Sequence, residues 1–256
     1  MSKNLTIYKS FKTSVFSKMS NQSNISKVFS NKFNLQIVYE DNHIIIINKR
    51  AGDIVQGDKT GDKPLSDVVK SYIKDQYNKP GNVYLGVVHR LDRPTTGLVI
   101  FAKTSKVLPR LNALFVSKDI QKTYWAIVKN QPPKTEGTLT HWLKKNPKNN
   151  KSTAYIKEVK DSKKAILHYK ILQKLDTYYL LEVNLETGRH HQIRSQLASI
   201  GCPIKGDLKY GFDRSNPDGS IHLHARHITF MHPVKNETMA ITAPLPEDAV
   251  WKACNV

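Results

Sequence analysis

The feature that most constrains the fold is a pair of apolar runs joined by a short charged turn. Residues 84–88 and 98–102 have the composition of β strands, and the turn between them carries one acid, Asp92, flanked by Arg90 and Arg93. A strand–turn–strand unit holds its turn rigidly at the edge of a sheet. Two guanidinium groups so close in sequence favour the ionised carboxylate. The segment therefore predicts a charged carboxylate on a stiff loop.

The charge balance indicates a polyanionic partner. Forty Lys and Arg residues oppose 21 Asp and Glu residues, which gives a formal net charge of +19. Nucleic acid explains such an excess better than an anionic membrane surface does, and a generally lysine-rich surface is the alternative.

The cysteines and the apolar runs exclude several classes of protein. The two cysteines, Cys202 and Cys254, lie far apart and lack metal-ligand spacing, which argues against a disulfide framework and a zinc site and suits a reducing cytosol. No apolar run approaches the roughly 20 residues of a membrane helix. We expect a soluble, cytoplasmic protein.

The first 33 residues form a basic segment without periodicity. They contain Lys and Ser but no acid, since the first acidic residue is Glu40. A transit peptide, an upstream start before Met19 and an RNA-contacting arm are possible interpretations, although the absence of Arg weakens the first. We predict a disordered extension over residues 1–33 and a folded domain over residues 34–256.

The remainder of the chain mixes strands and helices without a regular βαβ alternation, which predicts an α+β fold with a mostly antiparallel sheet. The Lys-rich stretch 144–164 is predicted to be a surface loop or hairpin. Helices are expected from Pro64 to about Tyr77, around 108–115, and from just after Gly188 to Gly201. Strands are expected at 35–40, 43–48, 122–129, 165–172, 178–186, 221–230 and 237–242.

Three side chains are candidates for chemistry, each with a purely structural alternative. Asp92 could act as a nucleophile or base, or it could belong to a surface salt-bridge loop. Arg189, expected at a helix start, could pair with a carboxylate, clamp a phosphate or form a solvated ion pair. Tyr124, beside Lys122 on a strand, could stack on a nucleobase or simply fill the core.

The histidines raise the question of a metal site. His222 and His224 would share one face of a strand, but no acid or cysteine joins them at a usual ligand spacing. A Gly-rich phosphate loop is also missing from the sequence. We therefore expect neither a metal nor a nucleotide cofactor.

The segment from His89 to Leu98, His-Arg-Leu-Asp-Arg-Pro-Thr-Thr-Gly-Leu, resembles the catalytic signature of the RluA-type (RluA, RluC, RluD) pseudouridine synthases. The resemblance extends over residues 37–247 and includes the Thr-Gly-Arg-His-His-Gln-Ile-Arg segment at 187–194. It also includes the Gly-Cys-Pro-Ile-Lys-Gly-Asp segment at 201–207. Residues 1–33 are too short to be the S4-like RNA-binding domain that many relatives carry.

The resemblance implies a function and a set of site residues. Asp92 would be the nucleophile that isomerises uridine to pseudouridine, and Tyr124 would stack on the flipped uracil and assist proton removal. Arg189 would pair with Asp92, Ile193 would line the pocket, and Arg90 would help to fill the space left by the flipped nucleotide. The implied fold is an α+β domain whose central, largely antiparallel sheet is flanked by helices and crossed by an RNA cleft. Further residues expected to contact RNA are His89, Arg93, Lys122 and Arg194.

Three hypotheses follow. The first is a cofactor-free, monomeric isomerase that modifies ribosomal or transfer RNA and binds neither DNA nor membranes. The second is a catalytically inactive RNA- or ribosome-binding protein of the same fold. The third, and weakest, is a metal hydrolase built on the histidines.

Overall fold

The computed structural model describes residues 28–256, so most of the predicted N-terminal extension lies outside the described residues. The last residues of that extension contact the folded body. The backbone N–H and the hydroxyl of Ser30 donate hydrogen bonds of 3.0 and 2.6 Å to the carboxylate of Asp53. Lys32 forms an ion pair with Asp75. Contacts with the body therefore begin before the predicted boundary at residue 34.

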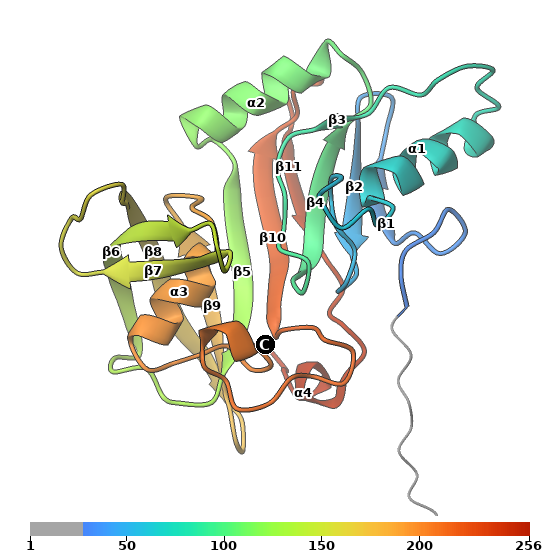
Figure 1. The fold of residues 1–256 in the computed structure, drawn as a ribbon. Coiled ribbons are helices and arrows are strands. Elements are labelled where there is room, and N and C mark those ends of the chain that lie inside the picture. The colour runs from blue at the N-terminus through green and yellow to red at the C-terminus, as the bar shows by residue number, and fades with distance from the viewer. Residues whose placement is uncertain (1–27) are drawn as a thin grey trace, which may run out of the picture.

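The described residues form one 11-stranded sheet in the order β1-β2-β4-β10-β5-β9-β8-β6-β7, with β3 beside β4 and β11 beside β10 (Figure 1). Neighbouring strands are antiparallel except β4 and β10, which are parallel. The predicted α+β fold with a mostly antiparallel sheet is confirmed. The strands are β1 Ile37–Glu40, β2 Ile44–Lys49, β3 Gly86–Val87, β4 Thr96–Ala102, β5 Gln121–Val128, β6 Glu136–Asn146, β7 Lys151–Tyr155, β8 Lys163–Lys174, β9 Tyr179–Leu185, β10 Leu223–Met231 and β11 Thr238–Thr242.

Helices cover both faces of this sheet. Helices α1 (Leu65–Gln76) and α3 (Gln192–Ser199) contribute to one apolar cluster, whereas α2 (Val107–Ser117) and α4 (Ala249–Lys252) pack into clusters on the other face. Figure 1 shows α1 and α3 in front of opposite ends of the sheet and α2 at its upper edge. Within the described chain, no helix is long and apolar enough to cross a membrane.

The continuous apolar runs of β2 and β4 are explained by burial on both faces. Ile45 and Ile47 point into the cluster under α1, and Ile44 and Ile46 point into the cluster under α2. All four are fully buried, and each contributes about 1.5–3 kcal/mol through the hydrophobic effect. The same alternation in β5 places Tyr124 on the face that α1 and α3 cover.

Helix α3 and strand β6 differ from the prediction, whereas the hairpin predicted as one form of the Lys-rich stretch 144–164 is present. Helix α3 begins at Gln192 rather than just after Gly188, because His191 adopts a left-handed conformation with φ 52° that prevents an earlier start. The Lys-rich stretch 144–164 contains the end of β6 and all of β7, which form a hairpin at the edge of the sheet. The sequence did not indicate β6, which pairs with β8 and β7, because most of its residues are exposed or half-buried and its apolar pattern is weak.

The loop of residues 89–95 between β3 and β4 is held from beneath by a buried lysine. The Nζ of Lys49 donates to the carbonyl oxygens of Arg50 at 2.8 Å and Arg93 at 3.1 Å. The N–H of Gly52 donates to the same Arg93 oxygen at 2.8 Å. Because the Lys49 side chain is buried, it maintains these contacts without competition from water.

Gly97 allows the close parallel pairing of β4 with β10. Its φ is +110°, a conformation that residues with a side chain rarely adopt. A Cβ atom at this position would lie 2.4 Å from the carbonyl oxygen of Ala225, its partner in β10. Only glycine fits both requirements.

We predict that Gly97→Ala lowers the free energy of unfolding by at least about 3 kcal/mol, because backbone strain and a backbone clash add together. Urea denaturation measures the change. Gly81→Ala is the matched control, since a Cβ there meets nothing within 4 Å, and it should change stability by less than about 0.5 kcal/mol. Equal unfolding midpoints for the two variants would contradict the explanation.

Candidate active site

The Asp92 carboxylate lies where the β3–β4 loop meets the start of α3. Its Oδ2 atom accepts a hydrogen bond of 2.9 Å from Nη1 of Arg194. The Asp92 side chain is 29% exposed, whereas the Arg194 side chain is only 5% exposed. A substrate can therefore reach the carboxylate, while its counter-ion stays buried behind it.

A second carboxylate fixes the position of Arg194. Asp207 accepts from Nε at 2.7 Å and from Nη2 at 2.8 Å, a two-point contact that sets the plane of the guanidinium group. Burial alone would lower the pKa of Arg194, but the hydrogen bonds and charges of Asp207 and Asp92 outweigh burial and raise that pKa. Arg194 is therefore a permanent cation whose remaining amino group is aimed at Asp92.

The expected ion pair between Arg189 and Asp92 is wrong. Arg189 is exposed, and its Nε donates to the carbonyl oxygen of Lys164 at 3.0 Å. The cause is the late start of α3, which leaves Arg189 in the preceding loop and turns Arg194 inward. The motif contains both arginines, and its sequence alone did not show which of them faces the aspartate.

The arginines on either side of Asp92 in sequence make other contacts. Arg93 pairs with the carboxylate of Asp62, and Arg90 is exposed. The positive charge predicted next to the carboxylate is thus present, but Arg194 supplies it from 102 residues further along the chain.

Tyr124 and Ile193 supply the apolar part of the site. Both are buried in the same cluster as Leu91, which directly precedes Asp92. Burial raises the pKa of the Tyr124 phenol, and the negative charge of Asp92 adds to this effect. The phenol therefore retains its proton at neutral pH and can donate a hydrogen bond.

His89, at the start of the loop that carries Asp92, contacts strand β4 and helix α2. Its Nε2 accepts the N–H of Ile100 at 3.0 Å, and its ring packs on Phe115 with 4.9 Å between the centroids. Burial, helped by the charge of Lys122, lowers the pKa of His89 to about 3. The ring is therefore neutral.

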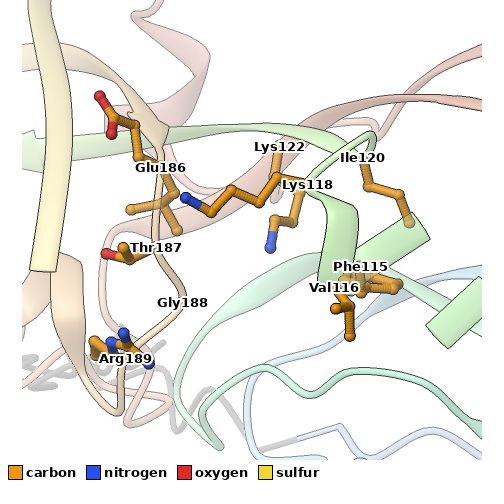
Figure 2. A pocket seen from close by; sticks show the side chains of 10 residues that line it. Phe115, Val116, Lys118, Ile120, Lys122, Glu186, Thr187, Gly188 and Arg189 are labelled. Carbon is orange, nitrogen blue, oxygen red and sulfur yellow. The ribbon is translucent and has the colours of Figure 1, made fainter. Parts of the chain in front are cut away.

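A basic recess of about 150 Å³ lies between the end of α2 and the loop before α3 (Figure 2). Lys118, Lys122 and Arg189 line it together with Phe115. Lys122 is two residues from Tyr124 on β5 and so points to the same face of the sheet. Burial lowers the pKa of Lys122, whose Nζ lies 5.2 Å from the centroid of the Phe115 ring. The recess therefore adds positive charge beside the Tyr124 face.

Three residues near Asp92 were missed as site residues. Asp207 holds Arg194, His191 has its Nε2 3.6 Å from Oδ2 of Asp92, and the Tyr210 hydroxyl lies 2.9 Å from Nδ1 of His191. Asp207 and His191 belong to the segments 201–207 and 187–194 that resemble the RluA-type synthases, but the sequence does not show which residues they contact. That assignment required the three-dimensional contacts.

The histidines considered for a metal site have protein partners. His222 Nε2 lies 3.2 Å from Asp248, and His224 Nδ1 lies 2.8 Å from the hydroxyl of Thr96. Within residues 28–256, no group of three or more His, Cys, Asp or Glu side chains is arranged to hold a metal ion.

Known structures share this fold. The human protein named RNA pseudouridylate synthase domain containing 4 superposes with a TM-score of 0.68 at 24% identity, over 83% of this chain and 89% of that one. A second human protein, RNA pseudouridylate synthase domain containing 1, gives a TM-score of 0.69 at 21% identity, over 87% and 89% of the two chains. The fold is that of the pseudouridine synthases.

Sequence comparison assigns the family. A family model for RNA pseudouridylate synthases matches residues 43–199. An uncharacterised RNA pseudouridine synthase of Synechocystis sp. is 34% identical over 216 residues, which are 83% of this chain and 66% of that protein. Ribosomal large subunit pseudouridine synthase D of Zymomonas mobilis is 32% identical over 224 residues, covering 84% and 70% of the two chains. The chain belongs to the RNA pseudouridine synthase family and is of the RluA type.

Three neutral histidines with lowered pKa values predict acid sensitivity. Burial lowers the pKa of His89 to about 3, of His191 to about 2 and of His224 to about 3, from about 6.5 in the unfolded chain. Between pH 6.5 and about 3 the unfolded chain binds more protons, so the free energy of unfolding falls as the pH is lowered. Each histidine contributes at most about 1.4 kcal/mol per pH unit.

Urea denaturation at pH 7 and pH 5 measures this slope. His89→Gln provides an amide oxygen that can accept the Ile100 N–H, and it should reduce the slope by up to one proton. A free energy of unfolding that stays constant from pH 7 to pH 5 would show that these histidines are not held neutral in the folded protein.

The buried Arg194–Asp207 pair predicts a large stability effect. Asp207→Ala leaves the guanidinium group buried with one carboxylate fewer and should cost about 3–5 kcal/mol, measured by urea denaturation. Asp213→Ala breaks an exposed pair with Lys129 and should cost less than about 1 kcal/mol. Similar costs for the two variants would show that Arg194 does not depend on Asp207.

Proposed function

We propose that this protein converts specific uridines in structured RNA to pseudouridine, with Asp92 as the nucleophile. The observation that carries the proposal is the accessible Asp92 carboxylate, held by the buried Arg194 guanidinium next to the buried Tyr124 ring. A carboxylate held in place by a buried counter-ion, with an apolar surface beside it, suits attack on a nucleoside that has left its base stack.

The reaction needs only a nucleophile and a place to hold the base. The target uridine leaves its stack, and Asp92 attacks the ribose or the base. The N1–C1′ bond breaks, the uracil turns, and C5 forms a bond to C1′. Loss of the C5 proton and release of Asp92 complete the isomerisation, and N1 takes up a proton. The overall change is an isomerisation, so atoms and electrons balance without an added reactant.

Arg194 has two functions in this scheme. Its charge lies opposite the carboxylate as a counter-ion, and its hydrogen bond to Oδ2 keeps the carboxylate from turning away from the substrate. Since Asp207 holds the guanidinium from the other side, little reorganisation is needed during the reaction.

Tyr124 supports the base and can change role during the reaction. In the resting site its phenol is protonated, partly because of the negative charge of Asp92. Once Asp92 forms a covalent bond, that charge is gone, so the phenol gives up its own proton more easily than before. Its phenolate form, which can accept the C5 proton, is then easier to reach. This change is consistent with a part in removing the C5 proton.

Ribosomal RNA is the substrate that we favour over transfer RNA. Several relatives are named ribosomal large subunit pseudouridine synthase D, including those of Zymomonas mobilis and Pseudomonas aeruginosa. The net charge of +19 and the recess lined by Lys118, Lys122 and Arg189 suit contacts with RNA phosphates. Free Cys202 and Cys254 suit a site of action in the cytoplasm.

Release of tritium from RNA carrying C5-tritiated uridine tests the function. Wild type should release tritium, and Asp92→Asn should release it at least about a thousandfold more slowly because the nucleophile is lost. Unmodified ribosomal RNA and transfer RNA are compared as substrates. If wild type releases no tritium from either, the alternative of an inactive RNA-binding protein replaces the enzyme.

Arg189→Ala serves as the comparison in the same assay. Since Arg189 faces the recess and not Asp92, its loss should raise KM a few fold, leave kcat near wild type and reduce the salt dependence of binding by about one unit. A kcat as low as that of Asp92→Asn would contradict this placement and show that Arg189 acts in the catalytic step.

A further inference from the structure

His191 occupies an unusual position beside the candidate nucleophile. It is buried, and it directly precedes α3 in the left-handed conformation, with φ 52°. Its Nε2 lies 3.6 Å from Oδ2 of Asp92, and its Nδ1 lies 2.9 Å from the hydroxyl of Tyr210. The imidazole ring thus bridges the acid and a buried phenol.

Hydrogen-bond accounting assigns the position of the His191 proton. The N–H of Ser152 donates to the Tyr210 oxygen at 2.8 Å, so this oxygen is already an acceptor. The Tyr210 proton then has one available partner, Nδ1 of His191. An imidazole that accepts at Nδ1 carries its own proton on Nε2. That N–H faces Asp92.

The charges around the ring support this tautomer. Burial lowers the pKa of His191 to about 2, and the positive charges of Arg194, Lys209 and Lys145 and the ring of His190 act in the same direction. Burial raises the pKa of Tyr210 to about 12. Both groups are neutral at neutral pH, so the chain of donors persists.

The two donor groups near Asp92, the Arg194 guanidinium and the His191 imidazole, face the same carboxylate oxygen. Arg194 Nη1 and His191 Nε2 both face Oδ2, and in the described part of the chain Oδ1 has no hydrogen-bond donor. Oδ1 is therefore the oxygen left free to attack.

The backbone fixes where the imidazole points. His191 has a left-handed φ of 52° directly before α3, a conformation that His, like Asn and Asp, adopts more often than most side chains. The ring is thereby set beside Asp92, with its Nε2 atom 3.6 Å from Oδ2.

We propose that His191 is a positioning residue for Asp92. In the RNA-bound enzyme its Nε2–H donates to Oδ2, and the Ser152–Tyr210 chain holds it in the required tautomer. The 3.6 Å separation is longer than a hydrogen bond, and such contacts tighten when substrate binds. This inference rests on the proposed function.

Steady-state tritium release, with thermal melting measured in parallel, tests the inference. His191→Asn retains an acceptor for Tyr210 and suits the backbone, but it removes the donor to Asp92. We expect kcat to fall about ten- to a hundredfold and KM to change less than threefold, while Tm falls by a few degrees because the packing of the ring on His190 and Tyr210 is lost. His191→Gln can return an amide N–H near Oδ2, and it should recover part of the lost kcat.

Tyr210→Phe and His232→Asn complete the set. Tyr210→Phe removes the hydroxyl that holds the His191 proton on Nε2, without changing residue 191, and it should lower kcat. If His191→Asn does not fold, the result for Tyr210→Phe decides the test. His232 is another buried histidine paired with an aspartate, Asp41 at 2.9 Å, but it lies away from the site. His232→Asn should lower Tm and leave kcat within twofold of wild type.

The outcomes separate two failures. An inactive wild type would refute the proposed function. An active wild type with unchanged kcat in His191→Asn, or in Tyr210→Phe where that variant decides, would overturn the role of His191. Losses of kcat that simply follow Tm across all four variants would overturn it as well.

Discussion

The arrangement of the site depends on one buried guanidinium group. Burying a cation costs several kcal/mol, and here two carboxylates and the face of an aromatic ring offset that cost. Arg194 binds Asp207 at two points, reaches Asp92 with its remaining amino group, and lies 5.0 Å from the centroid of the Tyr210 ring. One side chain thus joins the β3–β4 loop, helix α3 and the segment before the 3₁₀ turn at Leu208–Tyr210. If any of these three segments shifted, the Arg194 guanidinium would either be exposed to solvent or lose one of its carboxylate partners.

The sheet provides the rigid frame that this ion pair requires. The loop of Asp92 ends in β4, which pairs with β10, and β10 in turn pairs with β5, the strand of Tyr124. Lys49 ties the loop to the end of β2 through backbone carbonyl groups, and Gly97 permits the close approach of β4 to β10. Asp92, the Tyr124 ring and the Arg194 counter-ion therefore lie on neighbouring elements that are joined by hydrogen bonds, and the candidate site is assembled before any ligand binds.

The fold was largely predictable from local patterns, but the partners within the site were not. The strand–turn–strand unit of Asp92, the strand of Tyr124 and the α+β class follow from alternation, turn residues and apolar runs. Strand β6 was not predicted, because most of its residues are exposed or half-buried and its apolar pattern is weak. Arg189 was assigned to Asp92 from its expected place at a helix start and from the resemblance, whereas the helix begins three residues later, after a left-handed His191 that composition does not reveal.

By itself, the sequence determined most of the elements and the basic character, and its resemblance to the RluA-type synthases singled out Asp92 and Tyr124 as candidates for the chemistry. The elements and the charge follow from short-range rules, since periodicity, turn chemistry and charge are all local properties of the chain. Only the tertiary structure decided that Arg194 is the counter-ion of Asp92, that Asp207 holds it, and that His191 faces the same carboxylate oxygen. Those choices depend on which donors and acceptors meet in space, and Arg194 lies 102 residues from Asp92 but only 13 from Asp207 along the chain. The requirement that each buried charge find a partner is satisfied only in three dimensions.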